Sequence, residues 1–191
     1  VSSLLFVAPS TVCGTDANPV QQPIRGVFAL STCSQCCPFD PQNVCRDSGL
    51  SDAGDGRWKL TTNAYIDGGT AWQSAYLRRG PEEQPIIEFD LGRQATVGRF
   101  HLWNQNGNPS RGFKDVSVTI STDGSAWHAV AQRFLFAAAP NSDDYLGEDY
   151  FFTPPVTARY IRLHCDSTHR SGGNPDIAGI AKIRFYEAEP A

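Results

Sequence analysis

The sequence contains no methionine, few charged residues and no apolar run long enough to cross a membrane. Charged residues make up 19% of the 191 residues, whereas about a quarter is usual in globular proteins. The formal net charge is −4, so the chain lacks the excess of positive charge that nucleic-acid binding requires. The nucleophile elbow, the His-Glu-x-x-His zinc motif and the glycine-rich phosphate loop are also absent. These absences argue against an enzyme and against nucleic acid as a partner.

Cysteine, in contrast, is frequent and unevenly placed. Of the six cysteines, five lie between Cys13 and Cys45, and the sixth is Cys165. An even number of cysteines is typical of a secreted protein with disulfide bonds, so we expect the protein to work outside the cell. Six cysteines allow 15 pairings, and sequence alone selects none of them. A structural zinc site is the other interpretation of Cys33-x-x-Cys36, but it usually needs a second spaced pair.

The composition changes near residue 50. Residues 1–50 are rich in Pro, Cys, Ser, Asn and Gln and show little helical periodicity. We interpret them as a loop-rich extension, tied by disulfides and packed on a domain that covers residues 51–191.

From about residue 57 onward, apolar and polar residues alternate with a period of two, as in half-buried strands. Five segments show this alternation, and each places apolar side chains on one face: 86–92, 98–104, 115–121, 159–165 and 181–187. Asp123-Gly124 predicts a hairpin turn after the third of them. Many half-polar strands without a long helix predict an all-β fold, an antiparallel β-sandwich.

Five motifs in order carry a family resemblance: "TNAYIDGGTAWQS", "PIIEFDLG", "FKDVSVTISTDGSAWHAV", "ARYIRL" and "GIAKIRFYE". Together they resemble the discoidin-type (coagulation factor 5/8 C-terminal) domain, a group that includes the galactose-binding-like carbohydrate-binding modules. The resemblance covers roughly residues 57–187. It implies an eight-stranded jelly-roll sandwich that binds ligands on loops at one end and is usually not an enzyme.

The N-terminal part is similar to a second family. "TVCG", "CSQCC" and "AWQS" resemble the laminin N-terminal domain, which is also a jelly roll with a cysteine-tied leader. This resemblance implies an alternative function, in which the cysteine-rich leader forms a protein–protein or assembly interface.

Many sugar-binding members of the discoidin-type family hold a structural calcium ion, so the resemblance raises the question of a metal. Asp67 and Thr70 match two of the ligand positions, but only two glycines separate them. The family's acidic ligand on the last strand is replaced by Lys182. Calcium needs six to eight oxygen ligands, so we expect no calcium and no other cofactor. Our hypothesis is that the Lys182 ammonium lies near Asp67 and takes over the role of the ion.

The resemblance implies a glycan or glycoprotein as partner, bound for attachment or adhesion. Sugars are recognised by forked hydrogen-bonding groups together with an aromatic platform. Arg111 and Asn174 match family positions that often contact the sugar, and Gln73 stands where galactose-binding relatives often have histidine. Loop residues complete the predicted site, because functional residues gather on long loops. They are His169 and Arg170, with Gln73 and Asn104 at the rim and Tyr76 or Trp103 as the platform. The alternatives are a surface Arg111 paired with Asp115, and a Trp72 that belongs to the core.

A membrane surface is the remaining alternative partner. Tyr76 and Leu77 precede Arg78 and Arg79, and an apolar tip with a basic flank suits an anionic lipid surface. The acidic residues that follow, Glu82 and Glu83, weaken this attraction. Because stable anchoring usually takes more than one signal, we expect membrane contact to be secondary.

Overall fold

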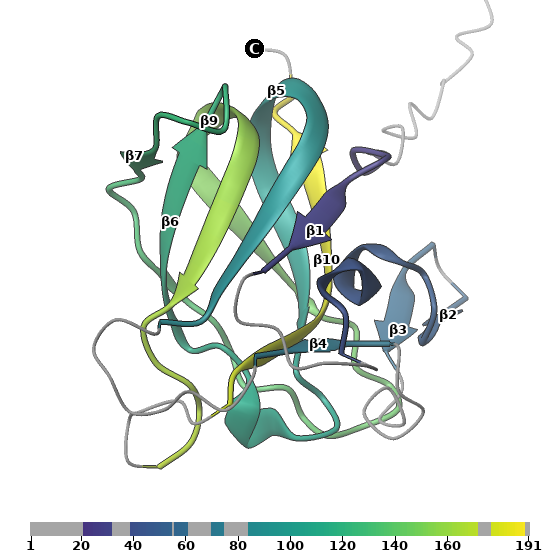
Figure 1. Cartoon of the computed structure of the whole chain (residues 1–191). Coiled ribbons are helices and arrows are strands. Elements are labelled where there is room, and N and C mark those ends of the chain that lie inside the picture. The colour runs from purple at the N-terminus through teal and green to yellow at the C-terminus, as the bar shows by residue number, and fades with distance from the viewer. Residues whose placement is uncertain are drawn as a thin grey trace, which may run out of the picture.

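The chain folds into two packed β-layers in a computed structural model that describes residues 21–31, 39–54, 56–60, 70–74, 84–171 and 177–189 (Figure 1). Helix in the described residues is limited to two short 3-10 turns, η1 (Pro41–Cys45) and η3 (Pro109–Arg111), and no helix there is long and apolar enough to cross a membrane. The strands are β1 (Phe28–Leu30), β2 (Leu50–Asp52), β3 (Trp58–Leu60), β4 (Trp72–Gln73), β5 (Ile86–Asn104), β6 (Asp115–Ser121), β7 (His128–Ala129), β8 (Phe134–Leu135), β9 (Glu148–Cys165) and β10 (Gly179–Glu187).

Two long strands connect the layers. β5 and β9 pair antiparallel along most of their length, with register shifts between Asp90 and Ala95 and between Val97 and Arg99. The first half of β5 also pairs with β1, and its second half pairs with β10. β9 pairs with β6 through its second half. The bends therefore allow β5 and β9 to contribute to both layers, which gives the antiparallel jelly-roll sandwich that the sequence predicts.

The predicted strands and their faces are largely confirmed. Ile87, Phe89 and Leu91 are buried, as are Val116 and Val118, and the predicted turn at Asp123-Gly124 joins β6 to β7. Gly124 adopts φ +78° in this turn, a conformation that glycine adopts without strain. The segments 86–92 and 98–104 were predicted as two separate strands. This is wrong, because they form one bent strand, β5.

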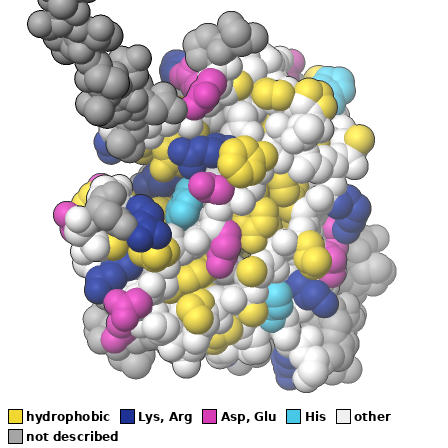
Figure 2. Space-filling model, turned by 180° about the vertical axis from the view of Figure 1, so that it is seen from behind, with side chains coloured by type: hydrophobic (Ala, Val, Ile, Leu, Met, Phe, Trp, Pro, Cys, Tyr) yellow, Lys and Arg dark blue, Asp and Glu magenta, His cyan; other side chains and the backbone are white. Residues whose placement is uncertain are grey.

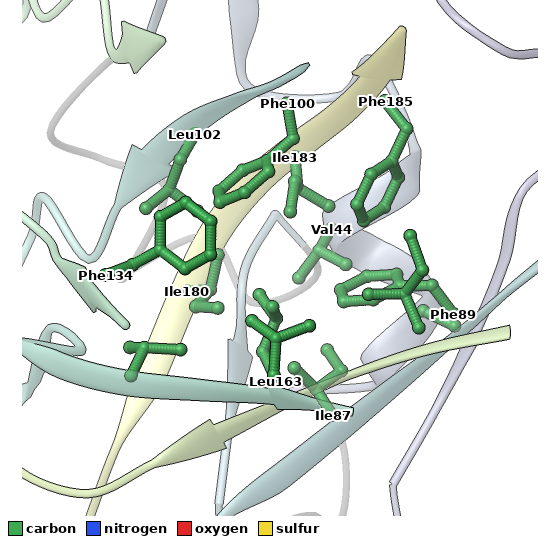
Figure 3. Packing of buried hydrophobic residues seen from close by; sticks show 14 of the residues in the cluster. Val44, Ile87, Phe89, Phe100, Leu102, Phe134, Leu163, Ile180, Ile183 and Phe185 are labelled. Atoms are coloured by element: carbon green, nitrogen blue, oxygen red, sulfur yellow. The ribbon is translucent and has the colours of Figure 1, made fainter. Parts of the chain in front are cut away.

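The main core fills the space between the layers, as Figure 3 shows for Ile87, Phe89, Leu163, Ile183 and their neighbours. Its centre is aromatic. The ring of Phe100 lies 5.2–6.0 Å, centroid to centroid, from the rings of five other aromatic residues: Phe134, Phe136, Tyr150, Phe152 and Phe185. Such edge-to-face and offset contacts add to the stabilisation that burial of the rings provides.

A smaller core covers the outer face of the layer that contains β10. Leu60 and Tyr145 pack there with Trp103 and Ala181, beneath the β2–β3 hairpin. Ala181 was predicted to face the main core, and this is wrong because a β-bulge between Ile180 and Lys182 shifts the alternation.

Glutamine side chains cap two of the strands. The Gln42 amide accepts a hydrogen bond from the Ala29 N–H at 2.8 Å and donates to the Val27 carbonyl at 3.2 Å. Gln132 does the same for β9, with the Thr153 N–H at 2.9 Å and the Phe151 carbonyl at 2.8 Å. Each amide thus replaces a neighbouring strand and satisfies backbone groups that would otherwise be open to another chain.

Basic side chains of β10 hold η1 against the sandwich. The Lys182 Nζ donates to the Asn43 carbonyl at 2.6 Å, and the Arg184 guanidinium donates to the carbonyls of Val44 (3.1 Å) and Arg46 (3.0 Å). Carbonyls at the end of a helical turn lack partners within it, so cations are favourable there. Part of the N-terminal segment is therefore fixed to the last strand of the domain.

The structure describes two of the six cysteines, Cys45 and Cys165, and both are thiols. The Cys165 Sγ lies 3.2 Å from the Ser167 carbonyl. Burial raises the pKa of the Cys45 thiol to about 11, with Arg184 and Lys182 acting in the opposite direction. The other four cysteines lie outside the described residues, so their disulfide pairing stays a prediction.

Candidate functional site

Several chain segments converge at one end of the sandwich, which lies at the bottom of Figure 1. Gly179 at the start of β10 pairs with Gln73 on β4 and forms a parallel bridge with Gly112, which follows η3. Phe113 forms a further bridge with Thr168, beyond the end of β9. These contacts bring the ends of three loops together.

Arg111 and Gln73 form the most direct link in this region. Arg111 is the last residue of η3, which Asn108 and Pro109 begin. Its Nη1 donates to the Gln73 Oε1 at 2.9 Å. Gln73 is fully buried, and its Nε2 has no hydrogen-bond partner among the described residues. The hydrogen bond of Arg111 that the structure shows goes to Gln73, and the Asp115 carboxylate accepts from the Ser167 hydroxyl.

Three consecutive amide side chains at the end of β5 are fully buried: Asn104, Gln105 and Asn106. Asn104 donates to the carbonyls of Phe113 and Ala137 at 2.8 Å each, and its Oδ1 accepts from the Gln105 N–H. Asn106 pairs with the backbone of Ser142 in both directions. Gln105 differs, because neither its Oε1 nor its Nε2 has a partner among the described residues.

Gly179 has no side chain, so Gln73 and Gln105 can lie close to its backbone. A Cβ added to Gly179 would lie 2.7 Å from the Trp72 carbonyl oxygen, 3.0 Å from the Gln73 Cγ and 3.4 Å from the Gln105 Nε2. Contacts below 3.0 Å to a backbone atom leave no room for a side chain there. Glycine at this position therefore allows Gln73 and Gln105 to approach the same point.

Thr168 and His169 lie beside this point. Thr168 is buried, and its Oγ1 has no partner among the described residues. The His169 N–H donates to the Gly112 carbonyl at 3.2 Å, and its ring Nε2 lies 3.1 Å from the Phe136 carbonyl. Burial lowers the pKa of His169 from its usual range, with the Phe136 carbonyl acting in the opposite direction. Within the described residues, all buried side-chain polar atoms without a partner belong to Gln73, Gln105 and Thr168.

The positions predicted for three of the ligand-binding residues are wrong. Trp103 was expected to form an exposed platform, but only 3% of it is exposed, because the β2–β3 hairpin covers it. Its Nε1 donates to the Trp58 carbonyl at 3.3 Å. Asn104 and Gln73 were both expected at the rim, but both are fully buried. The side-chain amide of Asn104 is hydrogen-bonded to backbone groups.

The remaining predicted residues fall into two groups. Gln73, Arg111 and His169 lie at the loop end, and Arg170 follows His169 on the exposed side of that loop. The others lie outside the described residues, and their roles stay predictions: Asn174, Tyr76 and the apolar tip with Leu77, Arg78 and Arg79. The alternative interpretation of Trp72 is confirmed, since it is fully buried in the core, with its ring 5.9 Å from that of Phe113.

The described residues do not fit a calcium ion. Lys182 is fully buried, and its ammonium group donates to the Asn43 carbonyl. The Ala71 carbonyl, beside Thr70, accepts from the Asn43 Nδ2 at 3.1 Å. Calcium requires six to eight oxygen ligands, whereas these carbonyls already accept hydrogen bonds from Lys182 and Asn43. Asp67 lies outside the described residues, so its proximity to Lys182 stays a prediction.

Adding calcium to the metal-free protein is therefore expected to leave the melting temperature unchanged within about 1 °C. A ligand that binds only the folded state at one hundred times its Kd would stabilise it by about 2.7 kcal/mol. Differential scanning fluorimetry with and without calcium, and with magnesium as the control, measures the difference. A rise of several degrees that is specific to calcium would show that an ion binds despite Lys182.

Gln105, like Thr168, is a buried polar residue of this region that sequence reasoning missed. Within "WNQNGN" it reads as one of several loop amides, and nothing in the alternation separates it from Asn104 and Asn106. The signal that was available is the run of three amides directly after an apolar strand. Only the hydrogen-bond partners distinguish the two structural amides from the third.

Comparisons with known proteins agree with this geometry. The family model for the F5/8 type C domain matches residues 48–183. A search of curated protein sequences found no significant match. Among solved structures, an F5/8 type C domain from Bacteroides fragilis is 12% identical, with a TM-score of 0.59 over 86% of this chain and 93% of that one.

Two further structures are sugar complexes from Clostridium perfringens. The module CpGH89CBM32-5, bound to GalNAc-β-1,3-galactose, is 17% identical, with a TM-score of 0.53 over 86% of this chain and 97% of that one. The family 32 carbohydrate-binding module of NanJ, bound to galactose, is 17% identical, with a TM-score of 0.51 over 86% and 96%. These structural likenesses concern the fold, and the family model covers more than half of the sequence. The chain therefore belongs to the F5/8 type C (discoidin) domain family.

Proposed function

We propose that this protein is a non-catalytic glycan-binding domain that acts outside the cell and binds its ligand at the loop end, in attachment or adhesion. The observation that carries the proposal is the arrangement at that end. Arg111 and Gln73 are linked there, and the buried polar atoms that lack partners in the described residues gather there. Buried polar groups are normally hydrogen-bonded, so such a concentration indicates a place prepared for a ligand.

The chemistry of these groups suits a sugar. A guanidinium group and side-chain amides offer forked donors and acceptors, which match neighbouring hydroxyl groups. The structurally similar modules in complex with galactose and GalNAc-β-1,3-galactose support a glycan as the ligand class. Their identity to this chain is low, so the particular sugar is left to experiment.

Other ligand classes have less support from the described residues. The described residues contain no group of three or more His, Cys, Asp or Glu side chains that could hold a metal ion. Figure 2 shows acidic, basic and hydrophobic side chains interspersed over one face, without a broad region of one charge. A mixed surface of this kind gives little long-range attraction to nucleic acid or anionic lipid. We infer reversible binding without a chemical step.

Replacing Arg111 by alanine is expected to weaken glycan binding by about 10- to 100-fold. Hydrogen bonds that involve a charged group contribute about 1.5–3 kcal/mol, and each 1.4 kcal/mol is a factor of ten in affinity. A glycan array with the wild-type protein identifies the ligand, and isothermal titration calorimetry then compares the variants.

Arg93 provides the matched control for this experiment. It lies at the register shift of β5 between Asp90 and Ala95 and forms an ion pair with Glu187, the last residue of β10, whereas the site lies at the first residue of that strand. Arg93→Ala removes the same charge and is expected to retain full affinity. Equal affinity of the Arg111→Ala and wild-type proteins would show that the sugar binds elsewhere, and an array without any positive glycan would refute the proposed function.

A further inference from the structure

We propose that Gln105 is a ligand-binding residue at the base of the site, where its side-chain amide bonds a hydroxyl group and so selects neutral sugar over acidic groups. This inference rests on the proposed function and deepens it. Gln105 was not among the residues that the sequence predicts. Its assignment depends on which side-chain amides of residues 104–106 have hydrogen-bond partners.

Gln105 differs from its two neighbours in the hydrogen bonding of its side chain. Asn104 and Asn106 are as buried as Gln105, and backbone groups satisfy both of their amide side chains. The Gln105 Oε1 and Nε2 have no partner among the described residues. A buried polar group without a partner costs free energy, whereas an apolar side chain of the same shape would not. The fold itself therefore gains nothing from an amide at this position.

The hydrogen-bonding capacity that remains defines the ligand chemistry. The Gln73 Oε1 already accepts from Arg111 and keeps at most one further lone pair, whereas the Gln73 Nε2 has no partner among the described residues and offers its donors to a ligand. Gln105 offers donors on Nε2 and an acceptor on Oε1. A hydroxyl group accepts from one amide and donates to the other, whereas a carboxylate or a sulfate has no proton to donate to the Gln105 Oε1. The amides thus match a neutral hydroxyl group.

The position of Gln105 agrees with a role at the base of the site. Its Nε2 lies beside the Gly179 α-carbon, where the Gln73 side chain also lies. Arg111 contacts Gln73 from the loop side and is only partly buried, whereas Gln105 is fully buried. A hydroxyl group reaches the Gln105 amide only if the rim shifts on binding, and such a shift is part of the proposal.

The hydroxyl group has two possible sources, the sugar itself or a water molecule that the sugar then contacts. Buried waters typically make two to four hydrogen bonds to otherwise unsatisfied groups. The two sources differ in the free protein. A water that bonds Gln105 before the ligand arrives would stabilise the fold, whereas an unpartnered amide would not.

The test compares Gln105→Met with Gln132→Met. Methionine matches glutamine in length and lacks its amide. The Gln132 amide caps β9 through the Phe151 carbonyl and the Thr153 N–H, so this control loses an equivalent side chain away from the site. Both variants and the wild type are applied to an array of neutral, sialylated and sulfated glycans. Affinity for the best neutral glycan and the melting temperature are then measured.

We expect the wild type to bind neutral glycans, and Gln105→Met to lose at least about tenfold in affinity, which corresponds to one strong hydrogen bond. Its melting temperature stays equal or rises if the sugar supplies the hydroxyl group, and falls if a bound water does. Gln132→Met is expected to lose stability and keep its affinity. Wild-type affinity in Gln105→Met, or a preference for acidic glycans, overturns the inference while the proposed function stands. A wild type that binds no glycan refutes the proposed function itself.

Discussion

Replacing Phe100 by alanine is expected to lower the free energy of unfolding by about 3–5 kcal/mol, the range found for large aromatic residues deleted from a core. Phe100 is fully buried, and its ring contacts side chains from both layers, including Phe134 and Phe185. Alanine would leave a cavity between the layers that the rigid strands around it cannot close. Urea denaturation, followed by tryptophan fluorescence, measures the loss.

Phe28→Ala is the matched control for this prediction. Phe28 lies on β1 with 56% of its surface exposed, so the same truncation there is expected to cost less than about 1 kcal/mol. A loss below about 1.5 kcal/mol for Phe100→Ala would show that the two layers do not depend on this aromatic centre for their packing.

The second large effect concerns Lys182 and pH. Burial lowers the pKa of Lys182 from 10.5 to about 7. Arg184 on the same strand also lowers it, as does Arg46, whereas Cys45 and Asp47 act in the opposite direction. Between pH 7 and pH 10.5 the unfolded chain binds a proton that the native state has released. The free energy of unfolding therefore rises with pH, by about 2 kcal/mol between pH 7 and pH 9.

The rise slows above about pH 9 and ends near pH 10, because Cys45 has the opposite linkage. Its pKa is raised from 9.0 to about 11, so above pH 9 the native state binds the additional proton and stability is lost as pH increases. Lys182→Met is expected to remove the rise between pH 7 and pH 9, because it removes the group that titrates. Urea denaturation at pH 7, 8 and 9 measures both proteins. The same rise in the methionine variant would assign it to another group.

Local alternation predicted the strands well, because the side chains of each strand meet either the core or solvent. It could not predict that β5 continues through its bend, since the bend depends on pairing with β9. Nor could it predict the burial of Lys182, which the cover of η1 produces. Distant parts of the chain determine both features.

The site was predicted less completely than the fold. The family resemblance identified Gln73 and Arg111, which the structure joins by a hydrogen bond. It also suggested Trp103 and Asn104, because residues next to a loop appear exposed in a sequence. Their burial depends on the β2–β3 hairpin and on the carbonyls of Phe113 and Ala137, which are remote in the chain. Gln105 was missed for the same reason, since only its unmet hydrogen bonds distinguish it.

Side-chain amide NMR tests the location of the ligand most directly. The glutamine NH₂ groups of the ¹⁵N-labelled protein are assigned and followed during titration with the best glycan from the array. We expect the signals of Gln73 and Gln105 to shift and saturate together, while those of Gln42 and Gln132, which cap the strands, stay in place. Saturable shifts confined to Gln42 or Gln132, with Gln73 and Gln105 unchanged, would contradict glycan binding at the loop end.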